Sequence, residues 1–148
     1  MKMEKNVILY KKLYIIFTVC AIDFLSKFLV SKYYTLYSYK KIFFIINFFY
    51  LKNYGIIFNI FSNSTKIEKL SLIIISFIII TILFQKNIKK KNLSYTLILS
   101  GALSNIINKI YCGFIIDFID IQINMHHIII FNIADISIII GSIMIIYN

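Results

Sequence analysis

The stretch LYIIFTVCAIDFLSKFLV, residues 13–30, is an apolar run that contains one acid, Asp23, and one base, Lys27. Such a run can cross a bilayer as a helix, because a transmembrane helix needs roughly 17–25 predominantly apolar residues. Three further apolar runs follow, at residues 70–84, 93–110 and 128–146. The sequence therefore predicts an all-α membrane protein with four transmembrane helices.

The chain as a whole is too apolar for a soluble domain. Of its 148 residues, 60% are hydrophobic and 15% are charged, and the mean hydropathy is +0.86. A soluble protein needs a larger charged surface, so we expect one integral membrane domain over residues 1–148. The net charge of +10 comes from lysines that lie between the apolar runs. Such lysines anchor helix ends at anionic headgroups, and no nucleic-acid partner is expected.

Residues 31–69 form the long connection between the first two predicted helices. Residues 42–51 within it are almost wholly aromatic or β-branched, which favours strands. The stretch is too short to span as a helix. Two interpretations stay open: a small extracytoplasmic β-rich loop with a strand pair on the membrane surface, or a re-entrant or interfacial segment.

Lysine density predicts the orientation. Four lysines precede the first helix, and four more lie in the short connection 86–92. Short basic loops stay in the cytoplasm. We therefore expect both termini inside and residues 31–69 and 111–127 outside.

Six acids occur in the chain, and three of them lie in or beside apolar runs. Asp23 and Lys27 are four residues apart on one helix face, so their simplest role is a mutual ion pair. Asp117 and Asp135 would reach the same outer boundary and could share one proton, as in aspartic proteases. From spacing alone we favour a simpler interpretation, in which Asp135 bonds within its own helix and Asp117 is solvated. Asp120 is the alternative carboxylate.

Polar residues recur in five short blocks: DFLSK (23–27), NYGIIF (53–58), SGALSNIINK (100–109), GFIIDFI (113–119) and FNIAD (131–135), with Gly141 beyond. In this order, and over nearly the whole chain, the blocks resemble the signature of lipoprotein signal peptidases, the aspartic peptidases of bacterial membranes. Each block alone is weak, but five in register are a specific pattern.

The resemblance implies a role for each matching residue. The catalytic pair would be Asp117 and Asp135. Polar or tight-turn positions lining the substrate site would be Asn53, Gly55, Asn105 and Asn132. Supporting positions would be Asp23, Lys27, Asn108 and Lys109. The chain departs from the family where Asn108-Lys109 replaces an Asp-Arg pair, because lysine lacks the planar fork of arginine. Without the resemblance, drift toward AT-rich codons together with helix–helix hydrogen bonding would explain the asparagines.

The implied function is that of an intramembrane aspartic endopeptidase. It would remove signal peptides from diacylglyceryl-modified prolipoproteins by cutting just before the lipidated Cys, without metal or organic cofactor. Prolipoproteins and membrane lipid would be its partners. We expect a monomer in the bacterial cytoplasmic (inner) membrane, with the active site at the outer face. The alternative is a small four-helix transporter that binds a cation or proton at Asp23 or Asp135.

Histidines and cysteines suggest no further chemistry. His126 and His127 are adjacent, have no ligand at useful spacing and are interpreted as interfacial polar residues rather than a metal site. Cys20 and Cys112 would lie too far apart for a disulfide.

Overall fold

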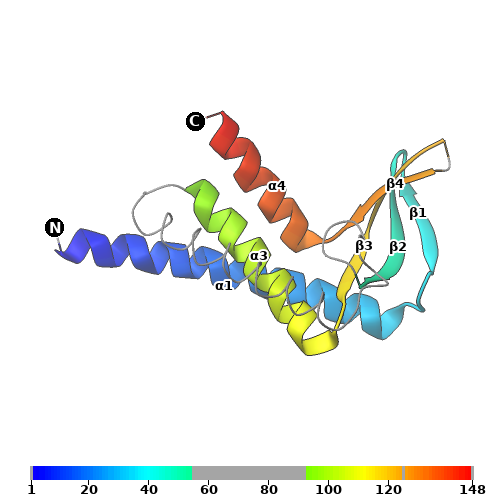
Figure 1. The fold of residues 1–148 in the computed structure, drawn as a ribbon, viewed down its shortest axis with the longest axis horizontal. Coiled ribbons are helices and arrows are strands. Elements are labelled where there is room, and N and C mark those ends of the chain that lie inside the picture. Colours follow the sequence, from blue (N-terminus) through cyan, green and yellow to red (C-terminus); the bar gives the residue numbers. More distant parts are fainter. Residues whose placement is uncertain (1, 55–92, 125, 148) are drawn as a thin grey trace.

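The computed structural model describes residues 2–54, 93–124 and 126–147. Its elements are α1 (Lys2–Tyr33), β1 (Tyr39–Phe43), β2 (Ile46–Asn53), α3 (Leu93–Cys112), β3 (Ile115–Ile123), β4 (His126–Phe131) and α4 (Ile133–Ile146). Figure 1 shows the three helices packed together, with the sheet at one end and both chain termini away from it. The helix predicted at 70–84 and the basic connection at 86–92 lie outside the described residues.

Two glycines let α3 and α4 approach closely. A Cβ on Gly101 would lie 2.2 Å from the carbonyl oxygen of Ala134, and one on Gly141 would lie 2.6 Å from the carbonyl oxygen of Ser94. Both distances are far below van der Waals contact. The contacted atoms belong to the backbone, which cannot rotate away as a side chain can. Small residues are common where helices pack in membranes, because they bring the backbones together.

Replacing Gly101 with alanine should therefore destabilise the fold. Overpacking a close contact typically costs about 1–3 kcal/mol, so we expect a lower midpoint of thermal unfolding in detergent. Ser142→Ala is the matched control, because the Ser142 hydroxyl donates within its own helix, to Ile138 O at 2.8 Å. An unchanged midpoint for Gly101→Ala would contradict the close packing of α3 on α4.

The four strands form one antiparallel sheet in the order β1-β2-β3-β4. A small apolar core, made of Val30, Phe48, Tyr50 and Ile116, joins the sheet to the end of α1. α3 ends where Gly113 adopts a φ of +78° and its N–H bonds to Lys109 O. Glycine favours this left-handed conformation after a helix. The turn sends the chain directly into β3.

The sheet confirms part of the predicted architecture and corrects the rest. Residues 42–51 do belong to a strand pair, β1 and β2. However, residues 115–123, expected in a loop, form β3, and residues 128–131, expected in the fourth helix, pair with β3 as part of β4. The helix starts later because Asn132 is its N-cap and Asp135 completes a capping box.

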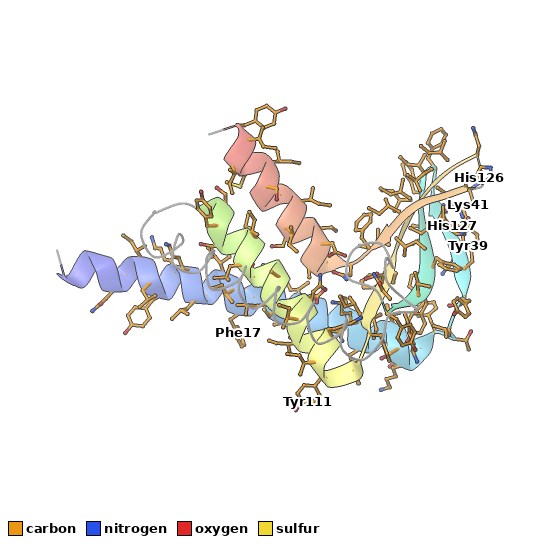
Figure 2. The ribbon with its side chains drawn as sticks, in the orientation of Figure 1. Phe17, Tyr39, Lys41, Tyr111, His126 and His127 are labelled. Carbon is orange, nitrogen blue, oxygen red and sulfur yellow. The ribbon has the colours of Figure 1, made fainter. Side chains whose placement is uncertain are left out.

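The helical surface is strongly apolar. Within the described parts of the chain, one helix, Asn6–Tyr33, is long and apolar enough to cross a membrane. α4 is apolar but has 14 residues, and α3 buries several polar side chains. Large apolar residues such as Phe17 on α1 and Ile146 on α4 stay exposed, at 73% and 77%. Figure 2 shows the Phe17 side chain pointing away from α1. Such a surface is suited to lipid contact.

Candidate active site

Asp117 and Asp135 are linked through Asn132, where β3 and α4 bring the sheet and the helices together. Asp117 lies in β3 and is 2% exposed, and Asp135 lies in the first turn of α4. Asn132, which is fully buried, contacts both of them. Its Nδ2 donates to Asp117 Oδ1 at 2.6 Å, and its backbone N donates to Asp135 Oδ2 at 3.1 Å. The sequence placed Asp135 two turns into a longer helix, whereas the cap places it in the first turn.

A second asparagine holds each carboxylate. Asn53, the last residue of β2, donates from Nδ2 to Asp117 Oδ2 at 2.9 Å. Asn105 on α3 donates from Nδ2 to Asp135 Oδ1 at 2.8 Å. Each of the four carboxylate oxygens therefore accepts one hydrogen bond, from donors on β2, α3 and the start of α4. The orientation of the two carboxyl groups depends on the packing of these elements.

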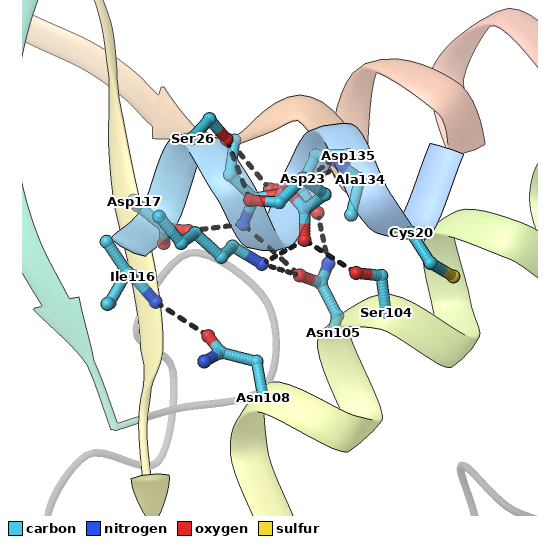
Figure 3. Close-up of polar contacts among 12 residues, drawn as sticks. Cys20, Asp23, Ser26, Ser104, Asn105, Asn108, Ile116, Asp117, Ala134 and Asp135 are labelled. Carbon is cyan, nitrogen blue, oxygen red and sulfur yellow. Dashed lines mark hydrogen bonds and ion pairs between the residues drawn. The ribbon is translucent and has the colours of Figure 1, made fainter. Parts of the chain in front are cut away.

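Asp23 and Lys27 form the expected ion pair, with Lys27 Nζ 2.7 Å from Asp23 Oδ2. Asp23 is fully buried and also accepts hydrogen bonds from Ser104 Oγ at 2.6 Å and from Ala134 N at 3.0 Å. α1 is thereby tied to α3 and to the start of α4, as Figure 3 shows.

Lys27 links this ion pair to the asparagines. Its Nζ donates to Asn105 Oδ1 at 2.9 Å. With Oδ1 accepting from Lys27, the Asn105 amide nitrogen is directed at Asp135. Asn132 Nδ2 also lies 3.2 Å from Asn105 Oδ1. A cation on α1 therefore fixes which end of the Asn105 amide faces the carboxylate.

Asn108 and Lys109 anchor the two strands that carry Asn53 and Asp117. Asn108 Oδ1 accepts from the backbone N of Ile116 at 3.1 Å, immediately before Asp117 (Figure 3). Lys109 Nζ donates to the carbonyl oxygen of Tyr54, next to Asn53. Both contacts are made to main-chain atoms. They require neither the planar fork of an arginine nor an acidic partner for it. Gly55 falls outside the described residues.

An open cavity of about 160 Å³ lies against this arrangement, and Asn53 and Asp117 are in its lining. Asn53 Oδ1 is buried and has no hydrogen-bond partner among the residues that the structure describes. A buried acceptor without a partner is costly. Asn53 Oδ1 is therefore suited to accept a hydrogen bond from a donor group of a bound ligand.

Burial raises the pKa of the Asp117 carboxyl from 3.8 to about 7. The hydrogen bond from Asn53 lowers this pKa and the charge of Asp135 raises it. A carboxyl with this pKa can hold a proton near neutral pH. Two coupled carboxyl groups that hold one proton between them can supply both an acid and a base.

The chain matches the family model described as signal peptidase (SPase) II over residues 15–148. It belongs to the signal peptidase II family. Among curated relatives, the lipoprotein signal peptidase of Buchnera aphidicola subsp. Schizaphis graminum is 46% identical over 138 residues, covering 89% of this chain and 88% of the relative. That of Wigglesworthia glossinidia brevipalpis is 40% identical and covers 90% of each chain.

Solved structures agree with this assignment to the signal peptidase II family. Two chains described as a bacterial membrane enzyme, at 2.3 and 1.9 Å resolution, each align with a TM-score of 0.79. They are 29% and 28% identical, cover 93% of this chain, and are themselves covered over 85% and 90%. The chain is therefore a bacterial membrane protein and an aspartic peptidase of this family, and the transporter alternative is not supported.

Sequence reasoning missed one feature beside the site. Asp120 is fully buried and its Oδ2 lies 2.8 Å from His127 Nδ1. His127 lies in the cavity lining with Asp117. The two residues are seven positions apart on paired strands, and only the position of β4 in the sheet brings them together. A prediction of a strand at 126–131, paired with 115–123, would have brought these two residues together.

Proposed function

We propose that Asp117 and Asp135 are the catalytic carboxyl groups with which this signal peptidase II family member removes signal peptides from prolipoproteins. The observation that carries the proposal is the shared contact with Asn132, which links Asp117, a residue of the cavity lining, to Asp135. The family assignment supplies the reaction, and the contacts select the residues.

The pair carries one proton between its two carboxyl groups, and we assign this proton to Asp117, whose pKa is raised to about 7. Asp135 then acts as the base: it takes a proton from water as the water oxygen attacks the scissile carbonyl. Asp117 donates its proton to the carbonyl oxygen. The tetrahedral intermediate collapses as Asp135 gives the proton taken from water to the leaving nitrogen, the C–N bond breaks, and Asp117 takes back its proton from the hydroxyl oxygen.

Asparagines around the pair position the carboxylates and the peptide. Asn105 and Asn132 donate to Asp135 and leave it oriented as a base. Asn53 donates to Asp117, and its unpartnered Oδ1 accepts an N–H of the substrate. Asp23 and Lys27 support this arrangement from α1 through Asn105 and Ala134.

The substrate in this proposal is a prolipoprotein whose Cys carries diacylglycerol, cut just before that Cys. The site lies where the apolar helices meet the sheet, so acyl chains could stay in lipid while the peptide reaches the carboxylates. In this proposal the chain spans the membrane four times, with both termini in the cytoplasm and the site at the outer face. The placement of both termini away from the sheet supports this orientation. The protein would act as a monomer.

Cleavage by the purified protein tests this proposal. A diacylglyceryl-modified prolipoprotein peptide should be cut to a product that begins at the lipidated Cys, which mass spectrometry would identify. The same peptide without the lipid is the control and should be cut poorly. Equal cleavage of both would contradict recognition of the lipid, and no cleavage of either would contradict the proposed activity.

The rate of cleavage should fall as the pH rises above about 7. The pKa of Asp117 in the folded protein is about 7, so its proton is present below that pH and is lost above it. Loss of the acid should lower kcat/KM about tenfold for each pH unit on the alkaline side. Stability changes with the same sign, because a raised carboxyl pKa favours the folded state at low pH.

Asn53→Ala distinguishes this explanation from a general alkaline loss. Removing the Asn53 amide removes a hydrogen bond that lowers the pKa of Asp117. The alkaline limb of the residual activity should therefore move to higher pH in this variant. A limb that stays in place, or moves to lower pH, would show that a different group controls it.

A further inference from the structure

The cavity that Asp117 and Asn53 line has a third polar residue, His127. Asn53 and Asp117 line it together with Leu51, His127 and the isoleucines 128–130 of β4. The His127 side chain is 41% exposed. His127 therefore belongs to the wall of the cavity that contains the proposed acid, next to the apolar isoleucines 128–130.

The imidazole is held in place from two sides. His127 Nδ1 lies 2.8 Å from Asp120 Oδ2, and the ring packs on Phe49 with the centroids 4.8 Å apart. A carboxylate at Nδ1 fixes the tautomer with the proton on Nδ1, which leaves Nε2 as an acceptor. Gln122 Nε2 lies 3.2 Å from Nδ1 and 3.4 Å from Nε2, so a ligand that donates to Nε2 must displace the longer of these contacts.

Burying the Asp120 carboxylate costs folding free energy. Its side chain is fully buried, and its Oδ1 has no hydrogen-bond partner within the described segments. Burying a carboxylate with one partner costs more than burying a neutral side chain of similar size. A role for its contact with His127 beyond stability would explain why this carboxylate is buried.

We propose that His127 is a substrate-binding residue, positioned by Asp120, whose Nε2 accepts a hydrogen bond from a main-chain N–H of the prolipoprotein peptide in this cavity. The inference rests on the proposed function and adds a residue to its site. His127 binds the peptide on the β4 side, whereas Asn53 binds it from β2. Because no proton moves at His127, its loss should weaken binding and spare the chemical step.

Steady-state kinetics on a diacylglyceryl-modified prolipoprotein peptide test this. His127→Phe should raise KM about three- to tenfold, the range of one hydrogen bond, with kcat changed less than twofold. His127→Gln, which keeps an acceptor, should recover part of the loss. His126→Phe is the matched control, because His126 is adjacent and exposed but does not line the cavity. It should leave both constants unchanged.

Substrates in which one amide at a time is replaced by an ester locate the contact. At the position that donates to His127, the ester should raise KM for the wild-type protein and leave KM unchanged for His127→Phe. Equal KM values for His127→Phe and His126→Phe, or a fall in kcat with KM unchanged, would overturn the proposal. An uncut peptide with wild-type protein would instead contradict the proposed function.

Discussion

Asp117→Asn should abolish cleavage, whereas Asp120→Asn should leave kcat nearly intact. An amide at position 117 can still accept the bond from Asn132 Nδ2, but it cannot give up a proton. Loss of general acid–base help alone typically costs ~10²–10⁴ in rate. Asp120 is equally buried and three residues away, yet it contacts His127 rather than Asn132, which links Asp117 to Asp135. Its replacement should act mainly on KM.

The comparison requires matched expression and matched insertion into membranes, so that the rate alone differs. Both variants remove one buried carboxylate from β3, and burial alone would make them equivalent. Equal losses of kcat in Asp117→Asn and Asp120→Asn would therefore contradict the assignment of Asp117, rather than Asp120, as the catalytic carboxyl group. Full activity in Asp117→Asn would show that the wrong carboxylate has been assigned.

Asp23→Asn should cause the largest loss of stability. Asp23 is fully buried, pairs with Lys27 and accepts hydrogen bonds from α3 and from the start of α4. Its replacement strands the Lys27 ammonium, which is 2% exposed. Breaking a buried ion pair by removing one partner typically costs ~3–5 kcal/mol. Denaturant unfolding in detergent should show this loss, and Ser26→Ala should not, because the Ser26 hydroxyl donates to Asp23 O within its own helix.

The double variant Asp23→Asn with Lys27→Met separates charge from packing. If the stranded ammonium causes the loss, removing it should return a large part of the stability. A double variant as unstable as Asp23→Asn alone would show that the bonds to Ser104 and Ala134 N dominate instead.

The sequence predicted the helices α1 and α3, because long apolar runs with few breakers have one simple interpretation. It did not predict where α4 begins. Residues 128–131 continue into α4 without a change in hydrophobicity, so periodicity could not separate strand from helix. The separating signal was local: an asparagine followed three residues later by an acid, Asn132 and Asp135, is an N-cap pattern.

The residues of the candidate site were largely named from the sequence, but their arrangement was not. Motif similarity selected Asp117, Asp135 and the three asparagines, whereas spacing alone favoured a solvated Asp117. The structure buries Asp117 instead, since β3 lies between β2 and β4. The Asp120–His127 contact needs the strand pairing of β3 with β4, which no pattern in an isoleucine-rich segment reveals.

The central claim is that Asp117 and Asp135 act together on the peptide bond. Its most direct test is cleavage of a diacylglyceryl-modified prolipoprotein by purified protein, with the wild type and Asp135→Asn assayed side by side at neutral pH. We predict a product that begins at the lipidated Cys for the wild type and no product above background for Asp135→Asn. Cleavage by folded Asp135→Asn at the wild-type rate would contradict the claim.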